Sequence, residues 1–241
     1  MKAILLAAGV GRRLKPITDT TPKCLIEIGG KTLLERHFEA FRHCGIRLVT
    51  IVLGHLAGQV RAKAETLASA TLACEFVMND RYELGSILSL HAASRSLADG
   101  AIVMDADVLY PAKLLKRLVD SGKVSCFLMD SRAKAGGEEM MIAARAGRVL
   151  RITRRPGEGW EQLGEGVGFL KIGRQHAPVL EKLLQRFVDE DRLKCEYEDA
   201  IDEFLKSCEA GFEDVSDLPW TEIDFPEDIA KAEREVLPLL G

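Results

Sequence analysis

The sequence contains few of the residues that most often stack against ligands. Among 241 residues there are two Trp and three Tyr, and aromatic side chains make up 6% of the total. Long apolar runs are missing too, since no stretch approaches the roughly 18 residues that a membrane-spanning helix needs. The short apolar stretch at residues 2–8 lacks the length and basic lead of a secretory signal. We therefore expect a cytoplasmic protein without membrane insertion.

Two further absences narrow the function. The six cysteines include no CxxC pair, so we expect reduced thiols rather than disulfides or a zinc site. An excess of basic charge is also lacking, because 33 Lys and Arg face 37 Asp and Glu for a net charge of −4. Binding nucleic acid without sequence preference requires a basic face, so we expect no nucleic-acid partner.

What is present is a regular alternation of short β-type runs and amphipathic helical runs in the first half of the chain. This rhythm predicts a mostly parallel sheet with helices on both faces. Thr32 and Glu35 form a capping-box pattern at one helix start, and Gly45 suits its C-terminal end. Strands are predicted at 3–7, 47–53, 72–77, 101–104 and 124–129, and helices at 32–44, 86–97 and 111–119.

The pattern changes after residue 130. A hairpin is predicted from 140–144 and 148–153, followed by a strand at 164–172 and helices at 177–187, 198–207 and 226–236. We expect one domain over residues 1–241, a Rossmann-like three-layer α/β fold with a small β-rich insertion. Within it we expect a nucleotide-binding core at 1–130, an acceptor-binding portion at about 131–225 and a C-terminal helix at 226–241.

A glycine-rich turn follows the first strand, and such turns bring backbone N–H groups to phosphates. Leu14 replaces the third glycine of a dinucleotide-binding fingerprint, and Leu25 replaces the first glycine of a P-loop, so neither motif is supported. Arg13 and Lys23 follow the turn. Cations at this point suit triphosphate chemistry, which accumulates negative charge in the transition state, although a solvated basic loop is the alternative.

Two aspartates far apart in the sequence are candidate metal ligands. Asp107 ends the strand run with Asp105 two residues before it, and Asp224 comes more than a hundred residues later, just before Pro226. Mg²⁺ favours one or two carboxylates together with phosphate oxygens. The alternatives are a structural role for Asp105, such as holding a loop amide, and helix N-capping by Asp224.

The segment LLAAGVGRRLKPITDTTPKCLIEIGGKTLLE resembles the signature of the sugar-phosphate nucleotidyltransferase superfamily. Its usual form is Gly-x-Gly-[Ser/Thr]-Arg-[Leu/Met] followed by Pro-Lys-x-[Leu/Met], and Arg12 stands here where the family has Ser or Thr. The resemblance implies that Arg13 grips the β- and γ-phosphates and Lys23 neutralises charge at the α-phosphate. It implies a nucleotide-binding loop made by Leu6, Ala7, Ala8, Gly9, Gly11 and Arg12, where Arg12 either adds a phosphate contact or points to solvent.

Later motifs resemble the choline-phosphate cytidylyltransferase branch and its relatives acting on 2-aminoethylphosphonate. They are NDRY at 79–82, SILSL at 86–90, GEGVG at 164–168, YEDA at 197–200 and WTEIDFPED at 220–228. The resemblance implies CTP as substrate, Mg²⁺ on Asp107 and Asp224, and nucleotide contacts from Asn79, Gly85, Ser86 and Asp105. Leu84-Gly85 replaces the Asn-Asn pair of many choline-phosphate members, which weakens that acceptor in particular.

The acceptor site is expected near the insertion and the last helices. A quaternary ammonium is best held by an aromatic cage with an acid, whereas a primary ammonium needs hydrogen-bond acceptors. The candidate acceptor-binding residues are Tyr82, Glu165, Lys171, Tyr197 and Trp220. Core packing is the alternative for Tyr197 and Trp220, and an outward-facing strand position is the alternative for Lys171.

Together these features predict a Mg²⁺-dependent cytidylyltransferase. The acceptor's phosphate or phosphonate oxygen would attack the α-phosphorus of CTP and displace pyrophosphate, without a side-chain nucleophile. One alternative is a sugar-1-phosphate nucleotidyltransferase using UTP, dTTP or GTP, although the hexapeptide repeats of its larger members are absent. The other is a non-catalytic nucleotide-binding regulatory protein. Whether the protein forms a homodimer is a question that the sequence leaves open.

Overall fold

The computed structural model describes residues 1–133 and 136–240, and its centre is a nine-stranded sheet. The strands follow the order β10-β9-β11-β6-β1-β4-β5, and β8 and β12 join the sheet through β11. Four strands from the first half of the chain are parallel neighbours and form the predicted core of the sheet. They are β1 (Lys2–Ala7), β4 (Leu48–Leu53), β5 (Ala73–Met78) and β6 (Ala101–Asp105).

The second half of the chain extends this sheet mostly with antiparallel pairs. The long strand β11 (Gln162–Ile172) runs antiparallel to β6, β8 and β9, and its register against β8 shifts between Gly166 and Leu170. The predicted hairpin is confirmed as β9 (Met141–Arg145) and β10 (Arg148–Thr153). The remaining strands are β8 (Cys126–Asp130) and β12 (Gly211–Asp214), which pair in parallel.

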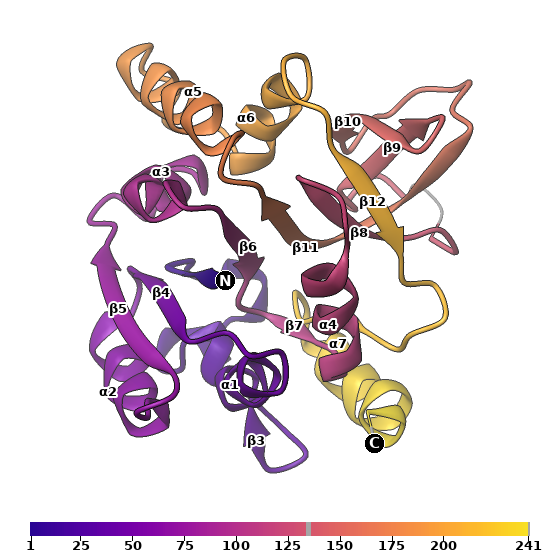
Figure 1. Cartoon of the computed structure of the whole chain (residues 1–241). Coiled ribbons are helices and arrows are strands. Elements are labelled where there is room, and N and C mark those ends of the chain that lie inside the picture. The colour runs from indigo at the N-terminus through magenta and orange to yellow at the C-terminus, as the bar shows by residue number, and fades with distance from the viewer. Residues whose placement is uncertain (134–135, 241) are drawn as a thin grey trace.

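Helices cover both faces of the sheet (Figure 1). Side chains alternate along β1, so Ala3 and Leu5 pack with α1 and α4, while Ile4 packs with α3, α5 and α6 on the opposite face. The three-layer α/β fold is thereby confirmed. One face carries α1 (Leu33–His43), α2 (Ala57–Leu67) and α4 (Ala112–Asp120); the other carries α3 (Ile87–Ala92), α5 (Ala177–Asp189) and α6 (Tyr197–Phe204).

Local sequence signals explain several boundaries. The capping box is present at α1, where the Thr32 hydroxyl accepts from the Glu35 backbone N–H at 3.1 Å and the Glu35 carboxylate accepts from the Thr32 N–H at 2.7 Å. The predicted helix at 86–97 is shorter, because α3 ends at Ala92 and a 3₁₀ turn follows at Ser94–Leu97. In the described part of the chain, no helix combines the length and apolar character required to cross a membrane.

Two short strands bring the end of the chain against the end of β6. β7 (Val108–Leu109) pairs antiparallel with β13 (Thr221–Glu222), and the Ile223 N–H donates to the Asp107 carbonyl at 3.0 Å. Helix α7 (Pro226–Lys231) follows and continues as a π turn at Ala232–Val236 and a 3₁₀ turn at Leu237–Leu239. Ala232 and Val236 of the π turn are buried in a separate apolar cluster with Leu14, Ile223 and Ile28, the last from the hairpin of β2 (Glu27–Ile28) and β3 (Lys31–Thr32). Ile229 of α7 is partly buried against this cluster. The N-terminal loop and the C-terminal segment are therefore joined beside β6.

Candidate active site

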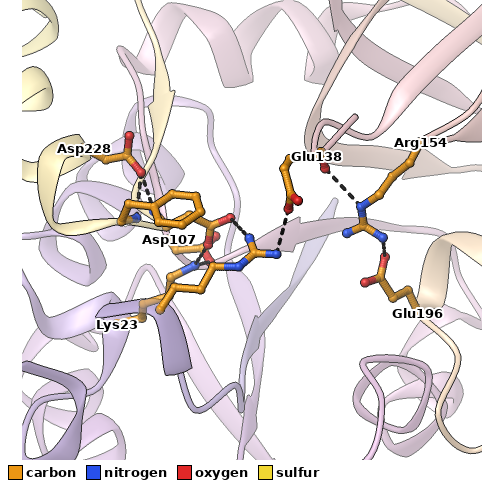
Figure 2. A network of polar contacts seen from close by, with 9 residues as sticks. Lys23, Asp107, Glu138, Arg154, Glu196 and Asp228 are labelled. Carbon is orange, nitrogen blue, oxygen red and sulfur yellow. Dashed lines mark hydrogen bonds and ion pairs between the residues drawn. The ribbon is translucent and has the colours of Figure 1, made fainter. Parts of the chain in front are cut away.

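Lys23 belongs to a network of charged side chains at the edge of the sheet (Figure 2). Its ammonium donates to Asp107 Oδ2 at 2.5 Å and also to Asp224 Oδ1. Lys23 opens a 3₁₀ turn after Pro22, whereas the two aspartates are brought together by the β7–β13 pairing. Burial alone would lower the pKa of Lys23, but the carboxylates of Asp107, Asp224 and Glu222 outweigh it and raise that pKa above its usual value.

Three carboxylates beside this lysine form a group that could hold a metal ion. Asp107, Glu222 and Asp224 each offer an oxygen, and these atoms lie within 4.8 Å of one another. Asp107 Oδ1 is buried and has no hydrogen-bond partner among the described residues, which leaves a lone pair directed into the protein. Hard oxygen donors of this kind suit Mg²⁺. Glu222 was missed in the sequence; it ends β13, and Asp224 follows two residues later.

The Asp224 carboxylate does not cap the following helix. The start of α7 is held by Asp228, whose carboxylate accepts from the backbone N–H of Asp224 at 2.9 Å and of Phe225 at 2.7 Å (Figure 2). The Asp224 side chain is thus left to contact Lys23 and Arg13, the latter at 3.2 Å.

A first cavity opens beside Lys23 at the carboxyl ends of β1 and β6, where ligands of α/β sheets bind. Gly85 permits a close approach of the chain at this wall, since a Cβ there would lie 2.3 Å from the Cys195 carbonyl. Most residues predicted to bind the nucleotide line this cavity, namely Leu6, Ala7, Ala8, Gly9, Lys23, Gly85, Ser86 and Asp105.

Four of the predicted nucleotide contacts lie outside the lining of this cavity, and one of them, Arg13, lines the second cavity described below. Gly11 shapes the loop, because its φ is +63° and a Cβ would approach Thr18 Cγ2 to 2.9 Å. Arg12 is exposed. Asn79 is buried after β5, where it donates to Ser89 Oγ at 3.1 Å and accepts from the Arg81 N–H at 3.0 Å, so it holds the turn.

A second cavity adjoins the first and has an acidic lining. Its charged residues include two arginines, Arg13 and Arg154, and seven acids, which are Asp105, Glu138, Glu139, Glu165, Glu198, Glu222 and Asp224. Burial raises the pKa of Glu165 to about 7 and that of Glu198 to about 8, and neighbouring carboxylates add to both shifts. Such a cavity suits a ligand that carries a positive charge.

Asp105 and Tyr197 separate the two cavities. The Tyr197 hydroxyl donates to Asp105 Oδ2 at 2.8 Å, and Asp105 lines both cavities. Burial, together with the nearby charges of Asp107 and Glu198, raises the pKa of Asp105. Gly168 on β11 makes room for this carboxylate, since a Cβ there would lie 2.3 Å from Asp105 Oδ2. Asp105 therefore has a hydrogen-bond partner in the Tyr197 hydroxyl and also borders both cavities.

The structure disperses the residues predicted to bind the acceptor. Glu165 and Tyr197 line the second cavity, whereas Tyr82 lines the first. Lys171 lies beyond the part of β11 that borders the cavity, and its ammonium donates to the Ser121 carbonyl at 2.5 Å. Trp220 donates from Nε1 to Asp130 Oδ2 at 3.0 Å and lines a neighbouring groove instead.

Arg154 was missed by sequence reasoning. It follows β10 and lines the second cavity, where its Nη1 donates to Glu196 at 2.7 Å and its Nε to the Glu138 carbonyl at 3.0 Å (Figure 2). A basic residue directly after a predicted hairpin was the only signal available.

Comparison with known proteins identifies relatives across nearly the whole chain. The MobA-like NTP transferase domain matches residues 3–187. Choline-phosphate cytidylyltransferase of Streptococcus pneumoniae is 26% identical over 248 residues, covering 97% of this chain and 97% of that protein. The enzyme of the same name from Haemophilus influenzae is 31% identical over 195 residues, covering 80% and 78%.

Two further likenesses concern the phosphonate branch and the fold. The 2-aminoethylphosphonate cytidylyltransferase of Lancefieldella rimae is 28% identical over 164 residues, covering 67% of this chain and 64% of that protein. The solved structure of CTP:phosphocholine cytidylyltransferase from Streptococcus pneumoniae aligns with a TM-score of 0.79 at 22% identity, covering 96% of this chain and 97% of that one. At this identity the structural likeness shows the fold.

Proposed function

The chain belongs to the family of MobA-like NTP transferase domains, and from this premise we propose that it transfers CMP from CTP to a small amine-bearing phosphate or phosphonate. The observation that carries this proposal is the position of Lys23 between Asp107 and Asp224, where the two cavities meet. Nucleotide binding is assigned to residues 1–130 and acceptor binding mainly to residues 131–225. The names of the cytidylyltransferase relatives support CTP as the donor.

The reaction requires little covalent work from the protein. A lone pair on the acceptor's anionic oxygen forms a bond to the α-phosphorus of CTP, while the bond from that phosphorus to the bridging oxygen breaks and pyrophosphate leaves with its electrons. The acceptor oxygen is already ionised at neutral pH, so no proton needs to be removed. Catalysis then depends on holding the two reactants together and stabilising the charge that moves onto pyrophosphate.

Each part of the first cavity has a place in this scheme. The Leu6–Gly9 turn approaches the nucleotide through its backbone, and the ammonium of Lys23 stabilises charge at the α-phosphate. Arg13 shares Asp224 with Lys23, which places its guanidinium where it can reach the outer phosphates. Asp107, Glu222 and Asp224 would hold Mg²⁺, which when bound neutralises phosphate oxygens.

The second cavity supports an acceptor with a positive charge. Its carboxylates, among them Glu165 and Glu198, can accept hydrogen bonds from an ammonium group. Its three aromatic side chains, Phe127, Phe169 and Tyr197, are each at most 6% exposed, so they offer little ring surface for a quaternary ammonium. We therefore rank 2-aminoethylphosphonate and phosphoethanolamine ahead of phosphocholine.

A pyrophosphate-release screen tests the proposal. The four ribonucleoside triphosphates and dTTP are crossed with 2-aminoethylphosphonate, phosphoethanolamine, phosphocholine and several sugar 1-phosphates, with Mg²⁺ and with EDTA. We expect release with CTP, an amine-bearing acceptor and Mg²⁺, and none with EDTA. Release with a sugar 1-phosphate and UTP, dTTP or GTP would instead assign a sugar nucleotidyltransferase, and no release with any pair would point to a regulatory nucleotide-binding protein.

A further inference from the structure

A chain of polar contacts links the N-terminal loop to the segment 136–140, which precedes β9. Arg13 Nη2 donates to Glu138 Oε2 at 2.9 Å, and the Glu138 carbonyl accepts from Arg154 Nε at 3.0 Å (Figure 2). Glu138 and Glu139 both line the second cavity. The segment 136–140 thus borders the acceptor space and is tied to Arg13 across it.

The Arg13–Glu138 contact excludes the binding of Arg13 to the outer phosphates of the nucleotide, which is the function proposed for this residue. The guanidinium lines the second cavity, where it is divided between Asp224 and Glu138, and it does not line the first. A triphosphate in the first cavity presents far more negative charge than one carboxylate. Binding of Arg13 to that triphosphate requires the guanidinium to leave Glu138.

We propose that Glu138 is a positioning residue that competes with the nucleotide for Arg13, so that nucleotide binding breaks the Arg13–Glu138 pair and releases segment 136–140 from the N-terminal loop. This inference rests on the proposed function. The released segment then exposes the acceptor cavity. The nucleotide therefore binds first and the acceptor second.

The Arg13–Glu138 ion pair is weak enough to break when a nucleotide binds. The side chains of Arg13 and Glu138 are 47% and 70% exposed, and ion pairs as open as this contribute little stability. The far end of the segment is held more firmly, because the Gly166 N–H of β11 donates to the Met140 carbonyl at 2.8 Å. The Glu139 carboxylate also accepts from the Gly136 N–H at 2.8 Å, which keeps the turn folded. Opening therefore frees the Glu138 side chain and loosens the segment, while the contacts of its backbone with Arg154 and Gly166 remain.

The test is a comparison of Glu138→Gln with Glu158→Gln, an exposed loop glutamate that lines neither cavity. CTP affinity is measured by calorimetry with Mg²⁺ and no acceptor. Loss of the competing charge should tighten CTP binding about two- to five-fold in Glu138→Gln, as expected for an exposed ion pair, and leave it unchanged in Glu158→Gln. The gain should shrink in high salt, because screening weakens the lost contact.

Two further readouts separate competition from a general structural effect. In Glu138→Gln we expect the KM for CTP to fall, whereas a general structural defect would raise it. Hydrogen exchange in segment 136–140 of the wild-type protein should become faster when CTP is added. Unchanged CTP affinity in Glu138→Gln, or slower exchange with CTP, would overturn the inference. Failure of the wild-type protein to bind any nucleotide would instead overturn the proposed function.

Discussion

At the scale of single residues, the site is governed by charge balance around Lys23. Its side chain is 15% exposed and contacts Asp107 and Asp224, while Glu222 adds a third carboxylate nearby. Removing one partner of such a buried pair leaves the remaining charges without compensation. Lys23 is therefore expected to contribute to both turnover and stability, and the two contributions can be measured separately.

We expect Lys23→Ala to lower kcat about 100- to 1000-fold, the usual effect of losing one preorganised group that stabilises transition-state charge, and to weaken CTP binding much less. It should also lower the melting temperature without metal, and Mg²⁺ should raise that temperature more in the variant than in the wild type, because a cation can replace the ammonium. Lys15→Ala, which removes an exposed lysine paired with Asp19, is the control. If Mg²⁺ raised the melting temperatures of Lys23→Ala and of the wild-type protein equally, the ammonium of Lys23 would not be balancing these carboxylates.

At the scale of elements, β11 places Asp105 through an irregularity. The strand shifts register against β8 near Gly168, whose φ of +78° and missing Cβ leave space for the Asp105 carboxylate. The shift lets one strand pair with β6 and β9 along the same edge. An alternating strand pattern in the sequence cannot reveal such a shift.

Gly168→Ala should therefore impair catalysis more than its effect on stability explains. The added Cβ would push the Asp105 carboxylate and break its hydrogen bond with Tyr197. Gly147→Ala is a matched control, since Gly147 has a φ of +72° but open space around its Cβ position. Backbone strain should cost each variant about 1 kcal/mol of unfolding free energy in urea, and Gly168→Ala should lose more because it also breaks a buried hydrogen bond. Comparable kcat/KM values for the two would show that Asp105 does not need this space.

Most elements could be predicted because their patterns are strong, and the failures have local causes. Helix α2 was missed because its buried residues are only Val60 and Ala64, so it shows little apolar periodicity. Strand β12 was missed because its residues are at most half-buried. Glu222 could have been found from its closeness to Asp224 in the sequence, whereas the placement of Lys171 and Arg154 depends on long-range packing that no local pattern records.

At the scale of the whole molecule, burial of one histidine makes stability depend on pH. His37 is fully buried in α1, its Nδ1 lies 3.0 Å from the Tyr110 hydroxyl oxygen, and burial lowers its pKa from 6.5 to about 4. The unfolded chain therefore binds more protons at this group between those two values, and stability is lost as pH falls through that range. Glu165 has the opposite influence, since its pKa is raised in the folded protein.

The contribution of His37 can be isolated by a difference measurement. Relative to His37→Gln, the wild-type protein should lose about 2 kcal/mol of unfolding free energy between pH 7.5 and pH 5, a figure that follows from the two pKa values. Urea unfolding at both pH values checks this, and the comparison cancels the titration of other groups. A constant difference between the two proteins would mean that folded His37 titrates normally.

The separation between the parts of the charged site along the chain has a consequence for biosynthesis. Lys23 and Asp224 are 201 residues apart, and their contact depends on the β7–β13 pairing and on the packing of α7 against the N-terminal loop. Contacts of this separation form late, because the intervening chain must first be ordered. A nascent chain on the ribosome therefore carries Lys23 and Asp107 without their third partner. The site becomes complete only when α7 has been made and has packed, so unfinished chains lack a complete site.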